Sequence, residues 1–139
     1  MAPAENNAES LMVRARRAAE CAHCPYTNFP VGAAVRCDDG TVIHGCNVVG
    51  ASYDLSICAE RVALFSAISQ GKKPLELALS YIDAQSDAAL GSRMLCGACR
   101  QVMQELLPKK SNVRDESSGT RQLEQLLPAP FELTQPTIN

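Results

Sequence analysis

Four residues in two short segments have types and a spacing that could do chemistry. Cys58 and Glu60 lie two residues apart in SICAER, and Cys96 and Cys99 form a C-x-x-C in CGACR. At the start of a helix this spacing points two sulfurs the same way, toward one ion. A third thiolate, from Cys58, would leave one tetrahedral position open, as in catalytic rather than structural zinc sites. We therefore predict a zinc centre formed by the three cysteines.

Glu60 decides between a catalytic site and simpler explanations. Taken alone, the C-x-x-C could equally be a redox pair or two unrelated small residues, and a Glu is favoured at any helix start by the macrodipole. If Cys58 holds a metal, however, Glu60 can reach the open position. There it can take a proton from an activated water and return it to a leaving group. A carboxylate that is not itself a ligand is typical of zinc-dependent deaminases.

A second C-x-x-C lies nearer the N-terminus. Cys21 and Cys24 flank His23 and could form a second metal site, but no further Cys or His pair completes it at finger-like spacing. Cys37 and Cys46 lie on expected strands. We interpret these four cysteines as buried apolar residues.

Hydrophobic periodicity and helix breakers predict the elements that must position these residues. The segments VGAAVRC and TVIHGCN flank Asp38-Asp39-Gly40, which is typical of a β-hairpin. The segment KKSNVRDESSG looks exposed, with room for at most a short strand around 112–114. We expect helices at about 9–21, 58–70, 97–107 and 120–127, strands at 31–37, 41–47 and 75–83, and loops at 24–30, 47–57 and 87–95. This alternation predicts an α/β sheet layered with helices.

Composition narrows the class of protein. The 139 residues suit one domain, with an irregular tail from about residue 129, and 46% of them are hydrophobic but only 4% aromatic. The net charge is −2 and the basic residues are scattered, which argues against a nucleic-acid partner. No run approaches the ~20 apolar residues of a membrane span. The N-terminal MAPAENNAES is no signal peptide, so we expect a cytoplasmic protein whose seven cysteines are not disulfide-bonded.

Five segments in this order resemble the small cytidine deaminases. They are PYTNFPVGAAV (25–35), GCN (45–47), ASYDLSICAER (51–61), CGACRQVM (96–103) and LLPAPF (126–131). The resemblance implies a three-layer α/β/α sandwich around a five-stranded mixed sheet, usually assembled as a homotetramer. It also implies a hydrolase of pyrimidine salvage that converts cytidine or 2′-deoxycytidine to uridine or 2′-deoxyuridine and ammonia.

The resemblance also implies a role for each matched residue. One Zn²⁺ per subunit would bind Cys58, Cys96 and Cys99, Glu60 would shuttle protons, and Arg61 would hydrogen-bond the thiolates. The implied substrate contacts are Phe29 on the base, Asn47 on the ribose 3′-hydroxyl, the backbone of Ala59 and Cys96 on the base edge, and Ala51, Tyr53 and Phe131 in a neighbouring subunit's pocket. Apart from the resemblance, Phe29 and Phe131 could be ordinary core residues and Arg61 a surface residue.

The sequence departs from the family beside the site. Val49 stands where the family has a Glu that shares the ribose 3′-hydroxyl, and Gly50 stands where it has an Asn. A charged hydrogen bond of this kind is worth about 1.5–3 kcal/mol. We therefore expect a wider pocket that tolerates sugar-modified or N4-modified pyrimidine nucleosides. Leu95 also replaces the usual Pro before the C-x-x-C, and Met94 comes before it.

Three rival functions fit parts of the pattern. A blasticidin-type or other aminonucleoside deaminase would share the zinc motif, but PYTNFPVGAAV favours the cytidine branch. An enzyme that edits nucleic acid is disfavoured by the lack of a basic path and by Cys58, where a His is usual. A non-catalytic zinc-stabilised module would have no use for Glu60.

Overall fold

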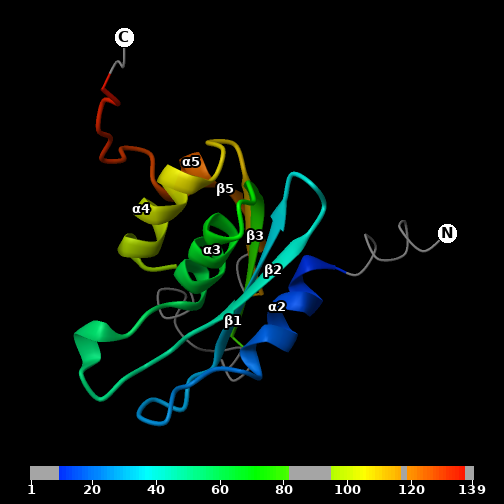
Figure 1. The fold of residues 1–139 in the computed structure, drawn as a ribbon, viewed down its shortest axis with the longest axis vertical. Coiled ribbons are helices and arrows are strands. Elements are labelled where there is room, and N and C mark those ends of the chain that lie inside the picture. The colour runs from blue at the N-terminus through cyan, green and yellow to red at the C-terminus, as the bar shows by residue number, and fades with distance from the viewer. Residues whose placement is uncertain (1–9, 82–94, 117–118, 137–139) are drawn as a thin grey trace, which may run out of the picture.

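The fold is a five-stranded mixed sheet between two layers of helices (Figure 1). A computed structural model describes residues 10–81, 95–116 and 119–136. The strands are β1 (Val31–Cys37), β2 (Val42–Cys46), β3 (Pro74–Tyr81), β4 (Asn112–Asp115) and β5 (Gly119–Gln122). The helices are α2 (Leu11–Ala19), the 3-10 turn η1 (Tyr53–Leu55), α3 (Ala59–Ser69), α4 (Gly97–Leu106) and α5 (Leu123–Leu126). The three-layer architecture that the resemblance implied is confirmed.

The strands follow the order β2-β1-β3-β4-β5. β1 pairs antiparallel with both β2 and β3, β3 pairs parallel with β4, and β4 pairs antiparallel with β5. The predicted hairpin is confirmed, with Ala34 opposite His44 and with Gly40 at φ 85° in the turn. In that turn the carboxylate of Asp39 accepts bonds from the Thr41 N–H at 3.0 Å and from Lys72 Nζ at 2.6 Å.

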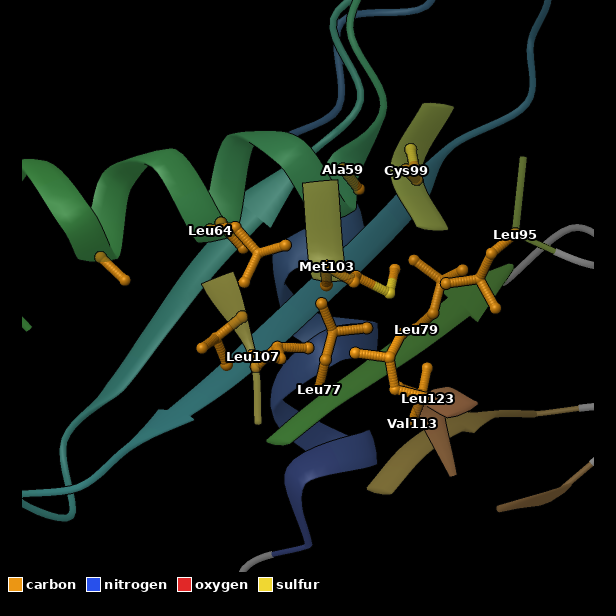
Figure 2. Packing of buried hydrophobic residues seen from close by; sticks show 14 of the residues in the cluster. Ala59, Leu64, Leu77, Leu79, Leu95, Cys99, Met103, Leu107, Val113 and Leu123 are labelled. Atoms are coloured by element: carbon orange, nitrogen blue, oxygen red, sulfur yellow. The ribbon is translucent and has the colours of Figure 1, made fainter. Parts of the chain in front are cut away.

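Two apolar clusters fill the spaces on either side of the sheet. The larger lies between the sheet and α3, α4 and α5, and Figure 2 shows Leu64, Met103 and Leu123 converging on Leu77 and Leu79. The smaller lies beneath α2 and includes its Met12 and Ala15. The layer that carries the candidate site is therefore the one with the larger core.

Two glycines allow helices to approach the sheet closely. A Cβ on Gly45 of β2 would lie 2.5 Å from the Ala59 carbonyl oxygen and 2.4 Å from the Ala63 nitrogen, both in α3. A Cβ on Gly32 of β1 would meet the backbone of α2 on the other face, 2.0 Å from the Ala15 oxygen. Real Cβ atoms do not approach backbone this closely, so Gly45 fixes the distance from α3 to the sheet.

The polar segment after Pro108 corrects two expectations. It contains the strand β4 and part of a second strand, β5, and Val113 and Asp115 are buried. The helix expected at 120–127 is reduced to α5, because residues 119–122 pair with β4 instead. The loop expected at 87–95, and the end of the strand expected at 75–83, lie largely outside the described residues. Among the described helices, none combines the length and apolarity needed to cross a membrane.

Candidate metal centre and adjoining pocket

The N-termini of α3 and α4 meet and bring the three predicted cysteine ligands together. Cys58 is the N-cap of α3, Cys96 is the N-cap of α4, and Cys99 lies in the first turn of α4. All three sulfur atoms lie within 4.8 Å of one another. The Cys58–Cys96 and Cys96–Cys99 Sγ distances are 3.9 and 3.3 Å. These bracket the ~3.8 Å edge of a tetrahedron with Zn–S bonds of ~2.3 Å.

The surroundings of the cluster favour a thiolate at Cys58, whereas the hydrogen bond to Cys58 and burial raise the pKa of Cys99. The pKa of Cys58 is lowered to about 5, chiefly by a hydrogen bond from Cys99 and further by one from Arg61. Arg61 Nη2 lies 3.7 Å from the Cys58 sulfur, while its Nε is buried without a hydrogen-bond partner. A guanidinium in contact with one of the three sulfurs fits a site of concentrated negative charge. Three convergent sulfurs, two helix N-termini and this guanidinium therefore fit zinc.

Glu60 lies in the first turn of α3 and is almost fully buried, with 4% of its surface exposed. Burial raises the pKa of its carboxyl group to about 7. Near neutral pH both the protonated and the ionised form are therefore accessible. A group with that property can accept and donate protons in one reaction cycle.

A pocket of about 250 Å³ adjoins the cluster. Its lining is mainly apolar, with few polar groups, as is usual for a small-molecule site. The lining residues are Val31, Asn47, Val49, Tyr53, Ser56, Ile57, Cys58, Ala59, Glu60, Tyr81 and Cys96. Glu60 and two of the cysteines thus share one pocket, which would be the place of any reaction.

The residues predicted to contact the substrate lie in three different places. Asn47, Tyr53 and Ala59 line the pocket of their own subunit. Phe29 is not among the lining residues but packs against the larger core, with its ring centroid 6.0 Å from that of the lining residue Tyr81. Phe131 lies on the C-terminal tail beside α4, away from this pocket, and lines a different hollow.

The amide of Asn47 also has a structural task. Its Oδ1 accepts the Val31 N–H at 2.9 Å, and its Nδ2 donates to the Phe29 carbonyl at 2.8 Å. These bonds join the residue that follows β2 to the junction between the 24–30 loop and β1. One N–H and one lone pair of the amide remain available for a ligand.

The positions that depart from the family lie at or beside the pocket. Val49 is buried and lines it. Gly50 donates its N–H to Ser56 Oγ at 3.1 Å, and a Cβ there would make only ordinary contact with Ser52, at 3.7 Å. No close approach therefore requires a glycine at position 50.

Sequence reasoning missed several lining residues. Tyr81 ends β3 and forms part of the pocket wall, and Ser56 and Ile57 lie just before Cys58. Tyr81 carried one signal, since it is one of few aromatic residues and lies at the end of a predicted strand. Ser56 and Ile57 carried none, because their position depends on the bridge between Val48 and Ile57.

The other four cysteines only partly match expectation. Cys37 is buried as predicted, Cys24 and Cys46 are half-buried, and Cys21 is exposed, so the prediction is wrong for Cys21. Cys21 follows the end of α2, where the helix no longer turns it toward the sheet. In the part of the chain that the structure describes, Cys58, Cys96 and Cys99 form the one group suited to a metal ion.

Comparisons with known proteins agree with this geometry. Residues 5–114 match the family described as the cytidine and deoxycytidylate deaminase zinc-binding region. A cytidine deaminase from Halalkalibacterium halodurans is 43% identical over 105 residues, 76% of each chain. One from Mycobacterium tuberculosis is 40% identical over 119 residues, 86% of this chain and 85% of the relative. The crystal structure of a Burkholderia pseudomallei cytidine deaminase superimposes with a TM-score of 0.75 at 41% identity, covering 87% of this chain and 96% of that one.

Proposed function

Because this chain belongs to the zinc-binding cytidine and deoxycytidylate deaminase family, we propose that it hydrolyses cytidine and 2′-deoxycytidine to uridine and 2′-deoxyuridine, releasing ammonia. The observation that carries this proposal is the buried Glu60 beside the three-cysteine cluster in one pocket. A zinc site that served only to stabilise the fold would gain nothing from a buried carboxylate with a raised pKa.

The chain's own residues account for the proton transfers. Zinc, when bound by the three cysteines, supplies the Lewis acid that activates a water molecule near neutral pH. In its ionised form Glu60 would accept a proton from that water and deliver it to N3 of the base. It would then accept the remaining proton of the added hydroxyl and deliver it to the departing amine, so each proton that it donates is one that it has accepted. The Ala59 backbone, next to Glu60, reads the polar edge of the base. Arg61 offsets the charge of the thiolates.

The resemblance further supports a homotetramer with shared pockets in the cytoplasm, acting in pyrimidine salvage. Phe65 and Ile68 on the outer side of α3 are 45% and 47% exposed, and Leu55 at the tip of its loop is 80% exposed. Apolar side chains left uncovered by their own chain are common at subunit interfaces. We infer that a neighbouring subunit covers them and that its Ala51 and Phe131 reach this pocket, whereas Tyr53 lines the pocket of its own subunit.

We propose further that the pocket accepts modified nucleosides. Val49 gives its wall an apolar surface where a carboxylate would demand a hydroxyl partner. The expected result is that 3′-deoxy or N4-substituted cytidines are turned over with a kcat/KM close to that of cytidine. A kcat/KM for cytidine far above those of all modified analogues, blasticidin-like aminonucleosides included, would contradict this extension but not the deaminase activity.

The experiment that tests the main proposal combines metal analysis with an assay. Purified protein is expected to contain about one zinc per chain and to convert cytidine to uridine. Removal of the metal with a chelator should abolish turnover, and added zinc should restore it. Turnover that survives complete loss of zinc would contradict the proposal.

A further inference from the structure

The C-terminal tail, residues 128–136, makes contacts that the proposed chemistry does not explain. It follows α5, has no helix or strand, and runs alongside α4 (Figure 1). The backbone groups of such a segment must be satisfied by side chains or water. Two side chains of α4 hydrogen-bond to the tail, and one of them, Gln101, binds its backbone.

Gln101 holds the peptide of Phe131 by both of its polar groups. Its Nε2 donates to the Phe131 carbonyl oxygen at 2.8 Å, and its Oε1 accepts the Phe131 N–H at 3.3 Å. These two hydrogen bonds fix the orientation of the peptide as well as its position. Three residues along the same helix, Gln104 Nε2 donates to the Glu132 carboxylate at 2.8 Å.

Both Gln101 bonds go to the backbone, so they leave the ring of Phe131 free. The residue is 67% exposed, and the hollow of about 490 Å³ between α4 and the tail is not filled by it. The tail is thus held firmly at a residue whose large apolar side chain its own subunit does not bury. Such a ring is suited to pack against a partner.

We propose that Gln101 is a positioning residue for the reaction: its amide holds the Phe131 peptide so that the ring reaches the pocket of a neighbouring subunit. This inference rests on the proposed function and its shared pocket. Since α4 also carries Cys96 and Cys99, one helix then holds two metal ligands of its own subunit and orients a wall of the neighbour's pocket.

A double-mutant cycle tests whether Gln101 acts through Phe131. Loss of the two bonds in Gln101→Ala should lower kcat/KM for cytidine roughly ten-fold, mainly through a higher KM. Zinc content should stay unchanged. Phe131→Ala should lower kcat/KM at least as much, and the double variant should match Phe131→Ala alone, because the two residues form one pathway. Gln101→Glu, which keeps the acceptor for the Phe131 N–H, should fall between wild type and Gln101→Ala.

Gln104→Ala is the matched control, because Gln104 donates to the side chain of Glu132 rather than to the backbone of Phe131. This substitution should leave kcat/KM nearly unchanged. Hydrogen exchange gives a second readout, since the Phe131 amide should exchange faster in Gln101→Ala. The inference would be overturned if Gln101→Ala lowered kcat/KM by the same factor in wild type and in Phe131→Ala. It would also be overturned if Gln101→Ala changed neither the exchange of the Phe131 amide nor the activity. An inactive wild type would instead show that the proposed function is wrong.

Discussion

At the scale of single residues, the site combines side chains that act on a ligand with side chains that hold the walls in place. Cys58, Glu60 and Arg61 occupy the first turn of one helix, so their order in the sequence sets their order in the site. Asn47 has the second kind of role, because its amide joins two backbone segments of the pocket wall. The two kinds of residue should respond differently to substitution.

Asn47→Ala should lower the free energy of unfolding by about 2 kcal/mol or more, because it leaves the Val31 N–H and the Phe29 carbonyl without their partners. Urea unfolding measures the change. Asn112→Ala, which removes an exposed asparagine from β4, is the matched control and should have little effect. Equal unfolding midpoints for the two variants would show that the hydrogen bonds of the Asn47 amide do not stabilise the fold.

The sequence was informative for the metal ligands because their chemistry is carried by residue type and spacing. It could not supply Ser56, Ile57 or Tyr81, since their place in the pocket depends on how loops and strand ends fold together. The placement of Phe131 away from its own pocket likewise follows from the path of the tail, which no periodicity records.

At the scale of elements, the position of the site depends on how closely α3 packs on β2. Helices and long strands were predictable from apolar periodicity, as α3, α4 and the β1–β2 hairpin illustrate. β5 was not, because GTRQ has no apolar alternation and pairs with β4 through its backbone. An edge strand of this kind is recognised by its partner rather than by its composition.

Gly45→Ala should push α3 away from the sheet and displace Cys58 and Glu60, so that zinc content per folded chain falls. The free energy of unfolding should also fall, by about 1–3 kcal/mol. Gly32→Ala is the matched control, because its Cβ would clash with α2 on the opposite face. It should destabilise the fold but retain zinc. Metal analysis of the folded fraction separates the two, and equal zinc loss in both would contradict the role given to Gly45.

The β1–β2 turn should give the fold a pH-dependent contribution. A hydrogen bond from Lys72, with others from Thr41, lowers the pKa of Asp39 below its usual 3.8. The folded state therefore favours the ionised form, and this stabilisation is present above pH ~3.8 and lost as the pH falls below it. Asp39→Asn should be less stable than wild type at pH 7, and the difference should shrink toward pH 2. A difference independent of pH would contradict this.

At the scale of the whole molecule, the subunit has a pocket and an aromatic ring that do not meet within one chain. The pocket lies at the N-termini of α3 and α4, whereas the Phe131 ring projects from the tail. The proposed homotetramer would bring a pocket and a neighbour's ring together. Each active site would then need residues from two chains.

Mixing two defective proteins tests this arrangement. Phe131→Ala keeps Glu60 but lacks the ring, and Glu60→Gln keeps the ring but lacks the proton shuttle. After subunit exchange the mixture should show more activity than the sum of the two proteins alone, because some pockets combine Glu60 with a neighbour's Phe131. Activity equal to that sum, with mixed oligomers present, would rule out a shared pocket.

The proposed reaction depends on Glu60, which moves protons at a zinc centre held by Cys58, Cys96 and Cys99. The most direct measurement is the loss of cytidine absorbance with wild type and Glu60→Gln, alongside zinc analysis of both proteins. We predict about one zinc per chain in each, turnover by wild type, and at least a 10²-fold lower kcat in Glu60→Gln, since acid–base catalysis contributes about 10²–10⁴ in rate. Full turnover by Glu60→Gln, with zinc bound, would show that Glu60 is not the proton shuttle.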